Sequence, residues 1–130
     1  MQRLVPMLAY DDARAALDFL CKAFGFRERF RMDMPNGTIG HAEVELDGHV
    51  VMLATTWHVG GFASPLDLPA KHSQILCYVD DVDAHHACAR DAGATIVNAP
   101  EDQDHGVRSY RALDLEGHRW IFATPLGERA

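Results

Sequence analysis

The sequence has few basic side chains and no long apolar segment. Lysine and arginine together number 12 against 19 aspartates and glutamates, which gives a formal net charge of −7. A nucleic-acid-binding face needs a basic excess to neutralise phosphates, and an electrostatic anchor on an anionic membrane needs the same. No apolar run approaches the ~18 residues that cross a bilayer. The composition therefore excludes nucleic acid and membrane as expected partners.

Cysteine is also scarce, and its spacing does not indicate a disulfide framework or a metal-binding motif. Cys21, Cys77 and Cys88 are an odd number and form no CxxC pair, so we expect reduced thiols. Residues 1–6 contain no apolar segment of the signal-peptide type. Both observations favour a cytoplasmic protein.

What the sequence does contain is an internal repeat. Residues 46–55, LDGHVVMLAT, resemble residues 115–124, LEGHRWIFAT, at an offset of 69. The same offset carries the acidic pair Asp11-Asp12 onto Asp80-Asp81. Two distant matches at one offset indicate two related modules, which we place at residues 1–57 and 72–126, with residues 58–71 as a linker.

Each module has the pattern of a β-α-β-β-β unit. An aspartate opens each predicted helix and a glycine, Gly25 or Gly93, ends it. The first module is predicted to have a helix over 11–24 and strands over 4–10, 26–33, 41–46 and 49–55. The second is predicted to have a helix over 82–92 and strands over 73–79, 94–99, 108–113 and 118–124. We expect an α+β protein whose two curved mixed sheets surround a cleft, formed either within one chain or across a dimer.

Several segments resemble the vicinal-oxygen-chelate superfamily of glyoxalases, extradiol dioxygenases and bleomycin-resistance proteins. The strongest is Arg108–Trp120, RSYRALDLEGHRW, which is similar to the family's closing hairpin, with Leu115 where proline is usual. The strand-to-helix junctions at residues 10–19 and 78–83 are similar as well. The resemblance covers nearly the whole chain and implies one glyoxalase-like domain over 1–130, nearest the metal-free glyoxalase-like and bleomycin-resistance-like branch.

The resemblance also implies where a metal would lie in this fold. Metal-dependent members place four ligands on the inner face of the cleft, and the matching positions here are Val5, Met52, Gln74 and Ile121. Three of these side chains are apolar or soft, and Gln74 is a neutral oxygen donor, whereas iron, zinc or nickel favours histidine and carboxylate here. We therefore expect the four positions to meet in a cleft without metal or other cofactor.

No catalytic residue is assigned, and His41 is the candidate. The alternating segment His41–Leu46 places His41 on the face opposite its apolar side chains, and its His-Ala-Glu sequence is similar to a segment of the glyoxalase-like branch. A histidine with its ordinary pKa near 6.5 can act as an acid or a base. No serine, cysteine or lysine lies in a recognisable nucleophile motif.

Candidate ligand-binding residues come from the cleft positions and from aromatic side chains near the linker and last hairpin. Arg108 and Tyr110 share a strand face and are expected to supply polar anchors. The complete candidate set is His41, Met52, Trp57, Gln74, Arg108, Tyr110, Trp120 and Ile121. A mostly apolar pocket with few polar groups is typical of a small-molecule binding site.

These observations predict a metal-independent small-molecule binding protein of the bleomycin-resistance type. Such proteins resemble one another in forming homodimers and sequestering a ligand, here an antibiotic or a metabolite, and the net charge of −7 would suit a cationic one. The alternative is a lyase, isomerase or dioxygenase with a rearranged metal site or acid–base chemistry at His41. A third hypothesis is a stress or regulatory protein that acts through its dimer surface.

Overall fold

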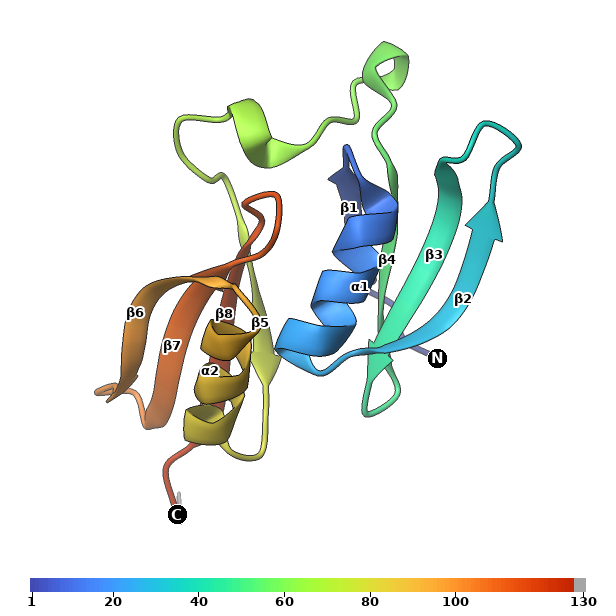
Figure 1. Ribbon diagram of the computed structural model, residues 1–130. Helices are drawn as coiled ribbons and strands as arrows, with labels where there is room; N and C mark the ends of the chain where they lie inside the picture. Colours follow the sequence, from blue (N-terminus) through green and yellow to red (C-terminus); the bar gives the residue numbers. More distant parts are fainter. Residues whose placement is uncertain (128–130) are drawn as a thin grey trace.

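A computed structural model of the protein describes residues 1–127. The first module consists of β1 (Met7–Tyr10), α1 (Ala13–Phe24), β2 (Arg27–Asp33), β3 (Ile39–Leu46) and β4 (His49–Thr55) (Figure 1). A linker with two short 3-10 turns, His58–Gly60 and Pro65–Asp67, leads to the second module. That module consists of β5 (Gln74–Tyr78), α2 (Val82–Asp91), β6 (Thr95–Asp102), β7 (Val107–Leu113) and β8 (Arg119–Pro125). The predicted pair of β-α-β-β-β units is therefore confirmed.

Each module forms its own four-stranded mixed sheet. The strand orders are β1-β4-β3-β2 and β5-β8-β7-β6, with a parallel pair at β1/β4 and at β5/β8. Met7 lies beside Met52 in the first sheet, and Leu76 lies beside Ile121 in the second. Both pairs are related by the shift of 69 residues, so the structure follows the repeat in the sequence.

Both helices begin directly after an aspartate that was predicted to open them. The Asp12 carboxylate accepts a hydrogen bond from the Ala15 N–H at 3.0 Å, and the Asp81 carboxylate accepts one from the Ala84 N–H at 3.1 Å. Such N-caps satisfy amide groups that have no partner within the helix. Gly25 ends α1 with a φ of 79°, a left-handed conformation that favours glycine.

The first strand is shorter than predicted, because a side chain replaces its expected backbone pairing. Strand β1 begins at Met7 rather than at Leu4, whose side chain is 88% exposed. The Gln2 amide instead bonds the backbone of Val50, donating to its carbonyl at 3.0 Å and accepting from its N–H at 2.6 Å. The other predicted bounds lie within three residues of the observed ones, and those of β4 coincide with them.

One core joins the two modules. Phe24, at the end of α1, packs its ring 5.5 Å from Trp120 and 4.8 Å from Phe122 of the second sheet, measured between centroids. These residues belong to a single buried cluster that also contains Leu17 and Leu20 of α1. Figure 1 shows α1 between the two sheets, with α2 against the second one. Each sheet therefore turns one face to the helices and leaves the other, called here its open face, uncovered in the single chain.

None of the helices within residues 1–127 is long and apolar enough to span a membrane.

Candidate functional site

The open face of the first sheet carries a row of side chains that crosses all four strands. Met7, Met52, Glu43 and Phe30 lie side by side on β1, β4, β3 and β2. Met7 is 63% exposed and Phe30 is 48% exposed. Large apolar side chains in such positions form a surface that favours a ligand or a covering partner over water.

His41 lies on this same face, as the alternation in its strand predicted. Its Nε2 is 2.9 Å from the Glu43 carboxylate, which also forms an ion pair with Arg29 at 3.3 Å. The Phe30 ring lies 5.8 Å from the imidazole. The structure thus brings His41 and Met52 onto one surface and gives His41 a carboxylate partner.

The open face of the second sheet holds two further predicted binding residues, Gln74 and Ile121. Leu76 and Ile121 lie side by side at the positions equivalent to Met7 and Met52, and Tyr78 is on the same face of β5. Leu76 and Tyr78 are 51% and 58% exposed. Gln74 is also on this face, where its side-chain oxygen accepts a hydrogen bond from Arg119 Nε at 3.0 Å.

Sequence reasoning missed two arginines on this second open face. Arg111 lies opposite Ile121, and Arg119 lies opposite Leu113 and beside Gln74. The signal was present, because the tight turn between Leu113 and Arg119 fixes the pairing of the strands on either side. Counting outward from that turn pairs residue 111 with residue 121 and places both on one face.

Three other predicted binding residues lie on the helix side of the second sheet. Tyr110 and Trp120 have no exposed surface. The Tyr110 hydroxyl is 2.6 Å from His85 Nδ1, and Trp120 Nε1 donates to Asp114 at 3.1 Å. Arg108 shares the face of Tyr110 and bonds two carboxylates, Asp83 and Asp102, at 3.1 and 3.0 Å.

For Arg108 and Tyr110 the structure does not support the expected ligand contact, whereas Trp120, although buried, lines the cavity between the modules that is described below. Strand alternation correctly indicated that Arg108 and Tyr110 share a face, but not that a helix covers it. Burial of the Tyr110 hydroxyl among apolar groups, with a smaller effect of nearby Cys88 and Cys77, raises its pKa well above the ordinary value. This phenol is therefore a neutral group of the core.

Trp57 lies beyond the end of β4, at the start of the linker. Its indole is 65% exposed and covers Gly60 so closely that a Cβ at Gly60 would lie 2.3 Å from the ring. The Trp57 backbone pairs with that of Phe62. The structure thus places Trp57 in a small exposed loop, away from the central rows of both open faces.

The four positions matched to the family's metal ligands do not meet within one chain. Val5 precedes β1 and Met52 lies on the first sheet, whereas Gln74 and Ile121 lie on the second, and the common core separates the two open faces. The expectation that they converge was wrong for the single chain, since the sheets pack through their helix sides. Within residues 1–127, no group of three or more His, Cys, Asp or Glu side chains could hold a metal ion. The donor set at these four positions does not fit a metal centre.

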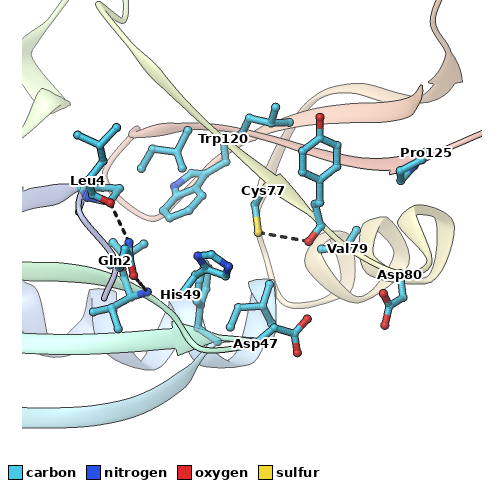
Figure 2. A pocket seen from close by; sticks show the side chains of 17 residues that line it. Gln2, Leu4, Asp47, His49, Cys77, Val79, Asp80, Trp120 and Pro125 are labelled. Carbon is cyan, nitrogen blue, oxygen red and sulfur yellow. Dashed lines mark hydrogen bonds between the residues drawn. The ribbon is translucent and has the colours of Figure 1, made fainter. Parts of the chain in front are cut away.

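A cavity lies between the modules, along the unpaired edge of β5. It has a volume of about 540 Å³ and is open to solvent. Figure 2 shows Gln2, Leu4 and His49 on one side and Cys77 and Val79 on the other. Burial, with a smaller effect of Asp47, raises the pKa of the Cys77 thiol to about 11. The cavity is thus mainly apolar, and its thiol is protonated at neutral pH.

This cavity has a closed counterpart at the equivalent place in the repeat. There the Glu116 carboxylate accepts hydrogen bonds from the backbone N–H groups of Asp11 and Asp12, both at 2.7 Å. The residues 69 positions away, Asp47 and Asp80, instead line the open cavity. One hairpin turn therefore joins the modules, while the equivalent turn leaves a space.

Comparisons with known proteins agree with this architecture. An uncharacterized protein of Mycobacterium tuberculosis is 38% identical over 128 residues, which cover 96% of this chain and 75% of that protein. The crystal structure of TioX from Micromonospora sp. ML1 is 35% identical, covers 99% of this chain and 100% of that one, and superposes with a TM-score of 0.74.

A family enzyme from Burkholderia phytofirmans, described as glyoxalase/bleomycin resistance protein/dioxygenase, shares the fold with a TM-score of 0.76. It is 19% identical and covers 94% of this chain and 97% of its own. The family model for the same group matches residues 3–122. The two β-α-β-β-β modules, their repeat and this match together show that the chain belongs to the Glyoxalase/Bleomycin resistance protein/Dioxygenase superfamily.

Proposed function

We propose that the protein binds a small, largely apolar molecule on its open sheet faces without a metal ion. The observation that carries the proposal is the pair of rows at the centre of these faces. Met52 on one sheet and Ile121 on the other occupy places where a metal-dependent relative would need polar donors, and the apolar Met7 and Leu76 lie beside them on the neighbouring strands. Such surfaces hold an apolar ligand and offer a divalent cation nothing that replaces its water shell.

We propose further that a second copy of the chain completes the site. In one chain the two open faces point away from a shared core, so neither is covered by the other. A two-fold dimer would place the first sheet of one subunit opposite the second sheet of its partner and form two equivalent clefts. The exposed Met7, Leu76 and Tyr78 would then line the clefts.

The biological role that follows is sequestration of an antibiotic or a metabolite in the cytoplasm. Binding alone would suffice for such a role, because a ligand held in a cleft is withdrawn from its target by mass action. Membership of a superfamily that includes bleomycin-resistance proteins supports this proposal.

A second candidate function is acid–base catalysis at His41. The observation that favours it is the 2.9 Å contact between His41 Nε2 and the Glu43 carboxylate on the open face. A carboxylate in that position orients the imidazole ring, as a third group does in sites where histidine acts as a general base. If this candidate is right, ligand bound by the purified protein is converted, and His41→Gln abolishes conversion while leaving binding intact.

The direct test uses the neutral fluorescent probe N-phenyl-1-naphthylamine. Protein treated with a strong chelator and shown by elemental analysis to be metal-free is titrated with the probe, and its melting temperature is measured with and without probe. We expect saturable binding and a raised melting temperature, since a ligand of the native state stabilises it. Loss of binding on chelation, restored by one metal equivalent per chain, would refute metal independence.

A further inference from the structure

The two open faces differ in charge at equivalent positions. Glu43 lies beside Met52 on the first sheet, and Arg111 lies beside Ile121 on the second. Because Met52 and Ile121 are equivalent in the repeat, their pairing partners Glu43 and Arg111 occupy equivalent places in the two sheets, although they lie 68 and not 69 residues apart in the sequence. Glu43 is engaged by His41 and an arginine, whereas the Arg111 guanidinium has no polar partner among residues 1–127.

Most other arginines do have carboxylate partners. Ion pairs with aspartate or glutamate engage Arg14, Arg27, Arg29, Arg31, Arg90 and Arg108. Arg111 and Arg119 are half-buried on the central strands of the second sheet, and neither pairs with an acid within the described chain. The protein has 19 acidic and only 12 basic side chains. Two arginines that share one face and have no carboxylate partner among the described residues therefore indicate an acidic partner from outside the chain.

Arg119 also contributes to a second cavity, at the start of β8. This cavity has a volume of about 150 Å³, and its lining includes Lys71, His72 and Arg119 but no aspartate or glutamate. Since a water molecule occupies roughly 30 Å³ in the liquid, the space can hold a carboxylate, sulfonate or phosphate group. The basic lining and the volume together fit an anionic group.

The geometry prepares Arg119 for such a contact. Its Nε donates to the Gln74 side-chain oxygen at 3.0 Å, which fixes the guanidinium plane and leaves both terminal nitrogens available. Arg111 is its diagonal neighbour on the adjoining strand, a placement that separates Cα atoms by about 7–8 Å. Two guanidinium groups so placed can share one acidic group or bind two oxygens of a larger one.

We propose that Arg119, assisted by Arg111 and positioned by Gln74, binds an anionic group of the ligand. The ligand class is then an organic anion with an apolar body, its acid group at the basic cavity and its body along Ile121 and Leu76. This inference rests on the proposed function, because it assigns a chemical class to the ligand of the same open face. It also replaces the cationic ligand that the net charge suggested, since the local charge of the site and not the total decides the contact.

The test compares two probes that share an apolar body. 8-Anilinonaphthalene-1-sulfonate carries a sulfonate, and N-phenyl-1-naphthylamine lacks it. Arg119→Gln and Arg111→Gln should each weaken binding of the sulfonate probe, by roughly tenfold for Arg119, and leave the neutral probe unchanged. Gln74→Leu should also weaken binding of the sulfonate probe, by less than Arg119→Gln does. Arg90→Gln, which removes the same charge from α2, is the matched control and should alter neither affinity.

Inorganic phosphate provides an independent check. It should displace the sulfonate probe but not the neutral one, beyond the effect of sodium chloride at the same ionic strength. Equal affinities of wild type and both arginine variants for the sulfonate probe would overturn the inference, while binding of the neutral probe would leave the proposed function standing. If Arg111→Gln and Glu43→Gln instead weaken dimerisation alike in sedimentation, Arg111 pairs with a second copy, which also overturns its role in ligand binding. Absence of binding by either probe would contradict the proposed function itself.

Discussion

The Tyr10 hydroxyl donates a hydrogen bond of 2.5 Å to the Asp114 carboxylate, and this contact joins the first strand of one module to the last hairpin of the other. Asp114 is 5% exposed and also accepts hydrogen bonds from Trp120 Nε1 and from the backbone N–H of Glu116 and His118. These donors satisfy a carboxylate that the fold removes from water, and a buried polar group without such partners would be costly. Burial, and to a smaller extent the neighbouring Asp114, raises the pKa of Tyr10.

Removal of one partner from this contact should destabilise the whole chain. Tyr10→Phe should lower the free energy of unfolding by about 1–2 kcal/mol, and Asp114→Asn by about 2–4 kcal/mol, because an amide turns an N–H group toward donors. Urea unfolding followed by circular dichroism measures both. Asp67→Asn, in the exposed linker, is the control and should stay within about 0.5 kcal/mol of wild type. Equal effects of Asp114→Asn and Asp67→Asn would show that the contact does not hold the modules together.

The repeat supplies a matched pair for the second inter-module contact. Glu116 accepts hydrogen bonds from two backbone N–H groups and from the Ser64 hydroxyl at 2.7 Å, whereas its equivalent, Asp47, lines the open cavity. Glu116→Ala leaves buried donors without an acceptor and should cost about 2–4 kcal/mol of unfolding free energy. Asp47→Ala should cost less than about 0.5 kcal/mol. Unfolding curves of the two variants, recorded under the same conditions, measure the two losses of unfolding free energy.

His85 should make stability depend on pH in the mildly acidic range. Its Nδ1 lies 2.6 Å from the Tyr110 hydroxyl and its Nε2 lies 2.9 Å from the Phe24 carbonyl, an arrangement that suits a neutral ring. Burial lowers the pKa of His85 in the folded protein. Below the ordinary pKa of about 6.5 the unfolded chain then binds a proton that the folded chain does not, so stability falls as pH falls.

The variant His85→Gln isolates this contribution. We expect the free energy of unfolding to decrease more steeply between about pH 7 and pH 5 in the wild type than in the variant. Chemical denaturation at several pH values gives both slopes. Parallel slopes would mean that His85 keeps the same proton affinity in both states.

The three cysteines should differ in reactivity. A pKa of about 11 keeps the Cys77 sulfur protonated at pH 8, and burial also raises the pKa of Cys21, whereas Cys88 is exposed. Because the thiolate is the nucleophile, iodoacetamide should modify Cys88 first and Cys77 slowly. Peptide mass mapping over time measures the order, and alkylation in urea shows the rates without the fold. Modification of Cys77 as fast as Cys88 in the native protein would contradict the described surroundings of β5.

Much of the fold could be predicted from the sequence because it depends on interactions between residues that are close along the chain. The offset of 69, the capping aspartates and Gly25 each act over a few residues, and the structure shows the elements they predicted. Within the first sheet the same alternation correctly placed His41 opposite the apolar side chains of its strand. These signals need no knowledge of how the modules pack.

The residues of the site could not all be predicted, because the alternation of side chains along a strand does not show which face of a sheet is covered. Arg108 and Tyr110 were expected in the cleft and lie under α2, since a strand pattern has two faces and the sequence does not say which one a helix covers. Arg111, one residue away, is on the open face. Packing of α2 against the second sheet decides which of its faces is covered, and the position of α1 in the core between the sheets separates Met52 from Ile121.

We propose that an apolar ligand, without metal, lies between the first sheet of one subunit and the second sheet of its partner. Met52→Lys and Ile121→Lys each put a charge in the middle of one open face, where the side chains point away from the core. In metal-free protein each variant alone should lose binding of N-phenyl-1-naphthylamine, because every cleft contains one altered wall.

Mixing the two variants under conditions of subunit exchange is the decisive measurement. A mixed dimer has one cleft with both walls altered and one cleft with neither, so fluorescence titration should recover about a quarter of the wild-type binding capacity. Circular dichroism should first confirm that both variants are folded. Recovery of that capacity is the result we predict. Two folded variants that fail to bind alone and recover nothing when mixed, or that bind like the wild type, would contradict the account.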